Sequence, residues 1–198
     1  DETACAAGIC AVIGMGASPG VSNLLAATAA AGLDTVRDAH TAWPVDVPGG
    51  GGDGGEVLLG PDGRPSAAAV HWMLQSSGKI CTVRGGQLTF ERPLRPVQLT
   101  LPRGRRGTAY TVGHPEPITL RRTLGLSGDA VNLVVIRPPT LAYHDVLRRD
   151  TDRRRLTHET AALQFAIPNL LRYLRSVPSS LRSRGPGTLP PFFAAASG

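Results

Sequence analysis

Residues 14–20, Gly-Met-Gly-Ala-Ser-Pro-Gly, form a glycine-rich segment between the apolar run 9–13 and the Ala/Leu-rich segment 21–33. A strand, a glycine turn and a helix in this order bring backbone amides close to a ligand, as in nucleotide-binding loops. The spacing is G-x-G-x-x-x-G, and Pro19 stands where the dinucleotide fingerprint has its third glycine. Proline has no N–H for a pyrophosphate, but it suits the first position of a helix capped by Ser18. The alternative is a tight turn that only closes a βα unit.

A histidine and a carboxylate stand two residues apart in the segment Gly113-His114-Pro115-Glu116-Pro117. The prolines favour an extended backbone, and residues two apart in a strand point to the same face. Such a pair can transfer a proton or orient a substrate. The alternative is a rigid strand end whose histidine and glutamate pair with their neighbours.

Three arginines near strand ends, Arg121, Arg122 and Arg137, are candidates for holding a substrate carboxylate through a bidentate fork. Exposed arginines at strand ends are also common without any such role. His71 and Trp72 favour a place in the core or at an interface. The order and spacing of the histidines, serines and aspartates favour no catalytic triad.

The formal net charge of +6 and a pI near 10 would ordinarily indicate nucleic acid as a partner. The basic clusters at 103–106 and 148–155 have no interleaved aromatic residues for base stacking, so we expect solvated faces and no nucleic-acid binding. The three cysteines, Cys5, Cys10 and Cys81, lack metal-ligand spacing and indicate reduced thiols and no metal site. Polar and glycine residues interrupt the apolar stretch 9–33, so we expect a cytoplasmic protein with no membrane partner.

The elements that must position these residues are predicted from apolar spacing and turn residues. Strands in series favour an antiparallel sheet in an α+β fold, with the helices packed on one face and the other face used for self-association. Gly85 and Gly86 indicate a tight hairpin, the run 48–55 a flexible loop, and residues from 176 onward an irregular tail. The predicted helices are 21–33, 66–76 with Ser66 as cap, and 156–173 kinked at Pro168; the predicted strands are 35–43, 79–84, 87–91, 97–101, 108–113, 118–122 and 131–136.

Two stretches together resemble the saccharopine dehydrogenase (saccharopine reductase) family. The first joins Ala-Ala-Gly-Ile at 6–9 to Gly-Ala-Ser-Pro-Gly-Val-Ser-Asn-Leu-Leu-Ala at 16–26, and the second is Tyr-Thr-Val-Gly-His-Pro-Glu-Pro at 110–117. The similarity spans most of residues 4–140. The resemblance implies a Rossmann nucleotide-binding domain that comes first, with the Gly-x-x-Pro-Gly turn at the junction into an α+β domain that binds substrate and mediates dimerisation.

The resemblance therefore implies that the chain begins at this junction and is a fragment. Residues 1–20 would be the end, or remnant, of a Rossmann domain together with the junction turn. Residues 21–175 would form the α+β substrate-binding and dimerisation domain, and residues 176–198 the irregular tail. We interpret the segment 3–8 as the end of a helix that starts before residue 1.

The function implied is that of the substrate-binding part of an NAD(P)-dependent oxidoreductase, with a small-molecule substrate and a homodimer. NAD(P) is expected in a full-length protein, and no cofactor is expected for this chain alone. Ser18 stands where the family commonly has aspartate, which argues against amino-acid-linked substrates. The alternatives are a stand-alone ligand-binding or dimerisation module and a non-redox enzyme, such as a lyase or cyclase, on the same fold. The predicted site comprises catalytic His114 and Glu116, substrate-binding Ser18, Pro19, Gly20, Asn23, Arg121 and Arg122, and cofactor-binding Gly16 and Ala17.

Overall fold

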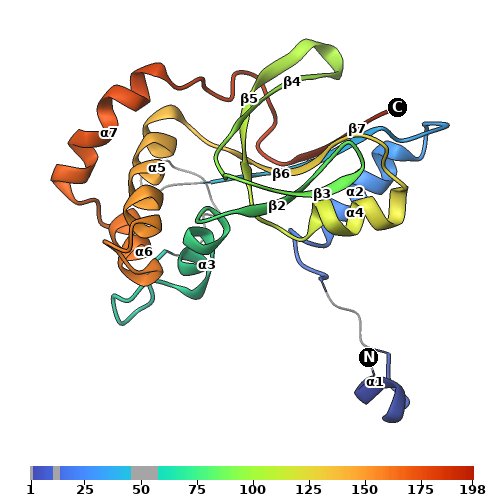
Figure 1. The fold of residues 1–198 in the computed structure, drawn as a ribbon, viewed down its shortest axis with the longest axis horizontal. Helices are drawn as coiled ribbons and strands as arrows, with labels where there is room; N and C mark the ends of the chain where they lie inside the picture. Colours follow the sequence, from blue (N-terminus) through green and yellow to red (C-terminus); the bar gives the residue numbers. More distant parts are fainter. Residues whose placement is uncertain (1, 11–13, 46–57) are drawn as a thin grey trace.

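A computed structural model describes residues 2–10, 14–45 and 58–198 of the chain. Over these residues the fold is α+β, with a mostly antiparallel seven-stranded sheet and helices packed against it (Figure 1). The helices are α1 (Glu2–Ala6), α2 (Val21–Ala30), α3 (Ala67–Gln75), α4 (Glu116–Leu124), α5 (Pro138–Asp152), α6 (His158–Ala166) and α7 (Leu170–Arg182). The strands are β1 (Asp38–Pro44), β2 (Ile80–Arg84), β3 (Gln87–Glu91), β4 (Pro96–Leu101), β5 (Arg105–Val112), β6 (Ala130–Val135) and β7 (Phe193–Ser197).

The sheet is built around β6, which lies beside three other strands. The strand order is β3-β2-β6-β1-β7, and β5 pairs with both β6 and β4. Only β1 and β6 run parallel, with Thr41 opposite Asn132, whereas every other pairing between the strands is antiparallel. The predicted antiparallel α+β architecture is therefore confirmed.

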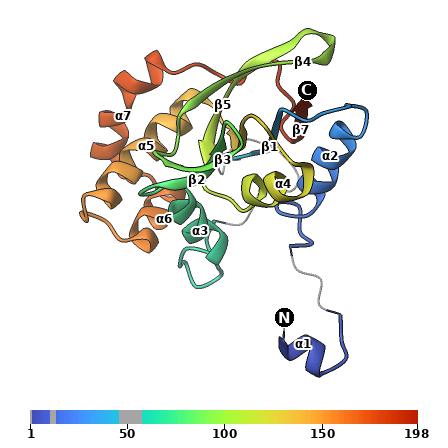
Figure 2. The ribbon, with the colours of Figure 1, turned by 45° about the vertical axis from the view of Figure 1, so that its right-hand side comes forward.

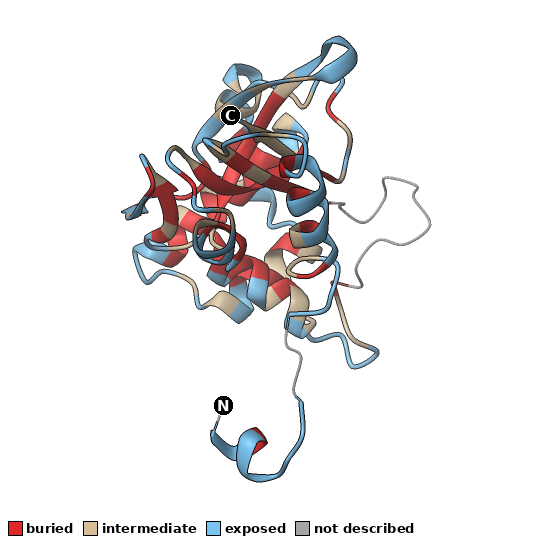
Figure 3. Cartoon of the chain, turned by 90° about the vertical axis from the view of Figure 1, so that its right-hand side faces the viewer, coloured by how far each residue is buried: buried red, intermediate tan, exposed pale blue. Residues whose placement is uncertain are grey.

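Alternate residues of β6 point to opposite faces of the sheet, as a strand requires. Ala130 packs with α2 and α4, and Val134 packs with α3, α5 and α6. Val131 and Leu133 face the other way, where Leu189 and Phe193 cover them together with residues of β4. Figure 3 shows the central strands largely buried and the outward faces of the helices exposed. The face expected to be free for self-association is thus partly covered by the chain's own C-terminal segment.

Several local predictions are confirmed. The hairpin β2–β3 turns at Gly85 and Gly86, whose φ angles are +54° and +72°. The Ser66 side chain caps α3 by accepting a hydrogen bond from the Ala69 N–H at 3.1 Å. Part of the predicted strand 9–13 and all of the predicted loop 48–55 lie outside the described residues, and residues 9–10 belong to no helix or strand.

Proline explains the main errors of the sequence-based predictions. The predicted strand 118–122 is wrong, because these residues lie in α4, which begins at Pro115-Glu116-Pro117. Helix α5 was missed, since it starts at Pro138 and Pro139. Proline is tolerated in the first turn of a helix, where its missing N–H has no partner to lose.

The prediction for the C-terminal part is also corrected. In place of one helix kinked at Pro168, α6 ends at Ala166 and α7 begins after Asn169, whose side chain accepts a hydrogen bond from the Arg172 N–H at 3.2 Å. The irregular tail is wrong for 176–182, which are helical, and for 193–197, which form β7 beside β1. Not all of the arginine run 148–155 is solvated, because Arg148 is buried between Asp145 and Asp152.

Candidate functional site

The glycine turn folds onto itself before α2 begins. The Gly16 N–H donates to the Pro19 carbonyl, and the Val21 N–H donates to the Gly16 carbonyl, both at 2.9 Å. Gly20 has a φ of +133°, and a Cβ there would collide with the backbone of Gly16 and Gly14. Only glycine fits this position, because it lacks a Cβ and accepts a positive φ. The turn thereby fixes the direction in which α2 leaves it.

The predicted capping of α2 by Ser18 is wrong. Gly20 is the N-cap residue, and its N–H donates to the Asn23 Oδ1 at 3.2 Å. The Ser18 hydroxyl instead faces across to α4, where it donates to the Glu116 carboxylate.

Three side chains from three segments converge on one buried carboxylate, that of Glu116. Ser18 and Ser22 both donate to Glu116 Oε1, the second at 2.8 Å, and His114 Nδ1 pairs with Glu116 Oε2. The Glu116 side chain is fully buried and that of His114 is 6% exposed. We call Ser18, Ser22, His114 and Glu116 the Glu116 cluster. The sequence predicted that His114 and Glu116 would meet on a strand, whereas His114 follows β5 and Glu116 opens α4.

The cluster holds Glu116 in its charged form. Burial alone would raise the pKa of Glu116, but the hydrogen bonds from His114, Ser18 and Ser22 outweigh it and hold the pKa below its ordinary value. The start of α4 adds a favourable dipole for a negative charge. A carboxylate can only accept, so His114 carries its proton on Nδ1. Nε2, which bonds to no described residue, is left to accept or donate a proton.

Two aromatic rings lie near the His114 imidazole. The ring centroids of Trp43 and His71 lie 6.3 and 6.4 Å from that of His114, and Trp72 lies 5.6 Å from Trp43. The Trp43 indole N–H donates to Asn132 Oδ1 at 2.7 Å, and this bond fixes the Trp43 ring to β6 at the centre of the sheet. Trp72 is a core residue as predicted, whereas His71 is exposed.

The structure brings together some of the other predicted site residues and separates others. Asn23 bridges α2 and α4, since its Nδ2 donates to Thr119 Oγ1 at 2.9 Å. Arg121 lies further along α4, where its Nε donates to the Gly86 carbonyl at 2.6 Å. Arg122 is exposed and shares with Arg121 an open pocket of about 470 Å³ beside the β2–β3 hairpin, away from the Glu116 cluster. Arg137 is exposed immediately before α5.

Sequence reasoning missed Ser22, Thr119, Trp43 and the contact of His71 with His114. Helical spacing does not relate Ser22 to Ser18, because Ser18 lies in the turn before α2, which begins at Val21. Trp43 and His71 come from β1 and α3, and their approach to His114 depends on the packing of the sheet against the helices.

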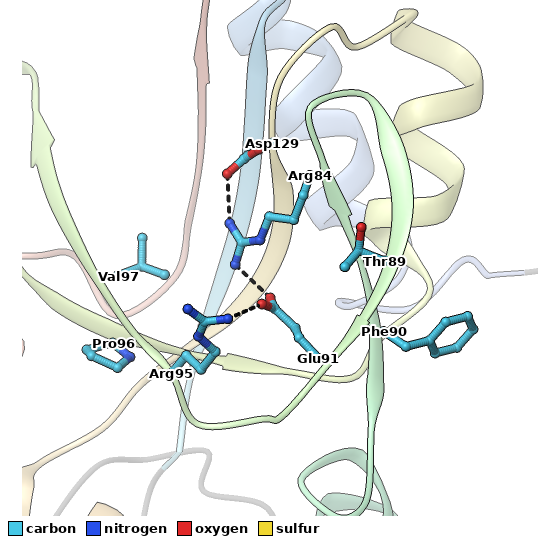
Figure 4. A pocket seen from close by; sticks show the side chains of 8 residues that line it. All are labelled: Arg84, Thr89, Phe90, Glu91, Arg95, Pro96, Val97 and Asp129. Atoms are coloured by element: carbon cyan, nitrogen blue, oxygen red, sulfur yellow. Dashed lines mark hydrogen bonds and ion pairs between the residues drawn. The ribbon is translucent and has the colours of Figure 1, made fainter.

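A second open pocket, of about 690 Å³, lies between the β2–β3 hairpin and the start of β4 (Figure 4). Arg84 bridges Asp129 at 2.8 Å and Glu91 at 2.6 Å, and Arg95 reaches the other oxygen of Glu91 at 2.7 Å. Burial would lower the pKa of Arg84, but the two carboxylates outweigh it and raise that pKa. The arginine charges here are compensated by the neighbouring carboxylates, so the pocket does not present a net positive surface to an anion.

Comparison with known protein families finds none whose model matches the sequence, and comparison with curated proteins finds none with significant similarity. Within the described part of the chain, no three His, Cys, Asp or Glu side chains gather in a way that could hold a metal ion. No helix among the described residues is long and apolar enough to span a bilayer.

Proposed function

We propose that this chain is the substrate-binding part of an NAD(P)-dependent oxidoreductase similar to the saccharopine dehydrogenase family, with the Glu116 cluster at its site. The observation that carries the proposal is that Ser18 and Ser22 bond to Glu116 across 98 and 94 positions of sequence. These residues belong to the two stretches, 16–26 and 110–117, on which the resemblance rests. Motifs that meet in space around a charged, buried carboxylate favour a shared chemical role.

His114 is the residue that would exchange a proton with the substrate. Glu116 holds the Nδ1 proton and fixes the orientation of the ring, which directs the chemistry to Nε2. Reduction of a carbonyl or imine requires a proton on the atom that becomes basic, and Nε2 of the imidazolium would donate it. In the oxidation direction, Nε2 of the neutral ring would accept that proton. Glu116, Ser18 and Ser22 act through His114 and are positioning residues.

The Gly16 amide is not available to a pyrophosphate. The Gly16 N–H is bonded to the Pro19 carbonyl at 2.9 Å. An amide that is already bonded within the turn cannot also serve a phosphate. Any cofactor-binding role of this turn therefore has to use groups other than the Gly16 N–H. The cofactor-binding role of Gly16 and Ala17 stays a prediction, as does the homodimer.

The test is nicotinamide oxidation by the complete protein of which these residues form part, measured with NADH and NADPH against a panel of small carbonyl and imine compounds. We expect His114→Gln to lower kcat by about a hundredfold or more per folded molecule, which is the usual size of a general acid–base contribution. His158→Gln, a histidine at the start of α6, is the matched control and should retain full activity. A protein that binds a ligand but oxidises neither nucleotide would support the stand-alone binding module instead.

A further inference from the structure

Helix α7 exposes its apolar side chains and buries polar ones, the reverse of an ordinary surface helix. Ser176 is 2% exposed, whereas Leu170, Leu171 and Leu181 are 68%, 73% and 83% exposed. An amphipathic helix of a globular protein normally buries its apolar stripe and exposes its polar face. The residues that form the exposed apolar surface of α7, which we call the leucine face, are Leu170, Leu171, Leu174, Val177 and Leu181.

Polar contacts hold α7 in this orientation. Asp150 of α5 is buried and accepts hydrogen bonds from Arg172 Nε at 2.9 Å and from Arg175 Nη1 at 3.2 Å. Burial would raise the pKa of Asp150, but these arginines outweigh it and hold the pKa below its ordinary value. The Tyr143 hydroxyl accepts the Asn169 N–H at 2.9 Å and fixes the start of the helix. Because charged groups attach α7 to the protein, its leucines remain exposed and can contact a binding partner.

The positive charge of the chain is concentrated around the same helix. Residues 153–184 contain seven arginines and one glutamate, which equals the whole formal net charge of +6. The rest of the chain contains as many acidic as basic residues. At 100° per residue, Arg175 and Arg182 stand beside Leu171 at one border of the leucine face. Arg175 bonds to Asp150, whereas Arg182 bonds to no described residue and carries the charge at this border. An occupant of this surface must therefore match both an apolar stripe and a strong positive charge.

Two other possible occupants fit less well. A second copy of the chain docked through its own α7 would bring two arginine-rich surfaces together, which costs electrostatic free energy even though Asp150 compensates part of the charge of each. A segment that precedes α2 would enter the fold at the opposite end of the molecule from α7 (Figures 1 and 2). Neither objection applies to a separate partner that has an apolar interior and a negatively charged surface. Such a partner would attract the arginines and could take up the leucine face.

We propose that α7 binds an anionic lipid surface, with the leucine face buried at the boundary between headgroups and acyl chains. The 13 residues of α7 span about 20 Å at ~1.5 Å per residue, short of the ~30 Å hydrocarbon core, so the helix lies in the membrane plane. A basic helix with a leucine face is typical of such interfacial binding. This departs from the expectation of no membrane partner, which rested on the absence of a spanning segment.

The test is co-sedimentation of the protein with vesicles of phosphatidylcholine mixed with phosphatidylglycerol, compared with vesicles of phosphatidylcholine alone. We expect binding to the anionic vesicles that weakens as salt is added. Leu171→Ser combined with Leu181→Ser should weaken it about tenfold or more, because two leucines no longer enter the interface. Phe90→Ser removes an apolar side chain that is 67% exposed on β3 and should leave binding unchanged. Arg182→Gln should weaken binding to the anionic vesicles only.

Three results would overturn the proposal. The first is equal binding to both vesicle types, and the second is equal binding by the wild type and the double leucine variant. The third is a dimer in vesicle-free solution that the double variant dissociates, since a second copy would then cover the leucine face. Circular dichroism should give the same thermal midpoint for all variants, because each substituted side chain is exposed.

Discussion

At the scale of single residues, Glu116 carries the buried charge of the proposed site. It is fully buried and remains charged because Ser18, Ser22 and His114 supply hydrogen bonds to both of its oxygens. A buried carboxylate without such partners would protonate instead. The three donors come from α2, the turn before it and the segment between β5 and α4, so the charge of Glu116 depends on the correct packing of these segments.

Replacing Glu116 by glutamine should destabilise the protein at neutral pH by about 1–3 kcal/mol, because charge-assisted hydrogen bonds are lost in a buried site. The pKa of Glu116 is lower in the folded state than in the unfolded chain, so this contribution is present above the unfolded pKa and is lost as pH falls through the folded pKa. Urea denaturation of wild type and variant should therefore differ at pH 7, and they should differ less at a pH below about 4.3, the ordinary pKa of glutamate in an unfolded chain. An equal difference at both pH values would contradict the assignment.

A second titrating residue, His144, is buried in α5 against Phe165 and bonds to Ser76 Oγ at 2.6 Å. Burial lowers the pKa of His144 to about 4. The unfolded chain binds this proton near pH 6.5, so stability should fall between pH 6.5 and 4, by ~3 kcal/mol in all. His144→Gln should flatten that part of the stability curve, measured by denaturant unfolding over the same range, whereas His158→Gln should leave it unchanged. A curve that keeps its slope in His144→Gln would show that another group is responsible.

At the scale of elements, the direction of α2 depends on Gly20. Its φ of +133° and its contact with Gly16 leave no room for a Cβ. We expect Gly20→Ala to cost about 2 kcal/mol or more in the free energy of unfolding. Gly32→Ala is the control, since a Cβ there would meet nothing within 4 Å and its backbone is unstrained. Urea unfolding of Gly20→Ala and Gly32→Ala measures the two free energies of unfolding. A Gly20→Ala protein as stable as Gly32→Ala would contradict the described turn.

Local signals predicted the elements whose stability is local. The two glycines of the β2–β3 hairpin and the Ser66 cap of α3 are examples, because their turn and cap chemistry lies within a few residues. The proximity of His114 and Glu116 was also predictable from their spacing, although the element was not. Their contact with Ser18 and Ser22 was not predictable from spacing, because it depends on how α2 packs beside α4.

The errors have physical causes as well. Pro115 and Pro117 were expected to favour an extended backbone, but proline also suits the start of a helix, as in α4 and α5. The helix predicted at 156–173 was expected to pack on the sheet, whereas α7 attaches to α5 through the ion pairs of Asp150 with Arg172 and Arg175 and leaves its leucines exposed. Such ion pairs form only in the packed molecule.

At the scale of the whole molecule, the proposal requires a nucleotide-binding part outside residues 1–198. We expect this chain by itself to bind NADPH weakly or not at all, because the Gly16 amide is bonded within its own turn. Fluorescence titration would measure this. Saturable binding with a Kd below about 10 μM, or roughly 7 kcal/mol, would contradict the expectation and restore a nucleotide-binding role to residues 14–20.

The central claim is that two segments about a hundred residues apart act as one proton-handling unit centred on His114 and Glu116. Nitrogen-15 NMR of the His114 ring at neutral pH tests it directly, because the chemical shifts distinguish a protonated from an unprotonated ring nitrogen. We predict that in the neutral ring the proton sits on Nδ1 and that Nε2 is free, since Glu116 accepts from Nδ1. In Glu116→Gln this preference should be lost, because an amide can donate to Nδ1 as well as accept from it. A neutral His114 with its proton on Nε2 in the wild type, or the same tautomer in both proteins, would contradict the account.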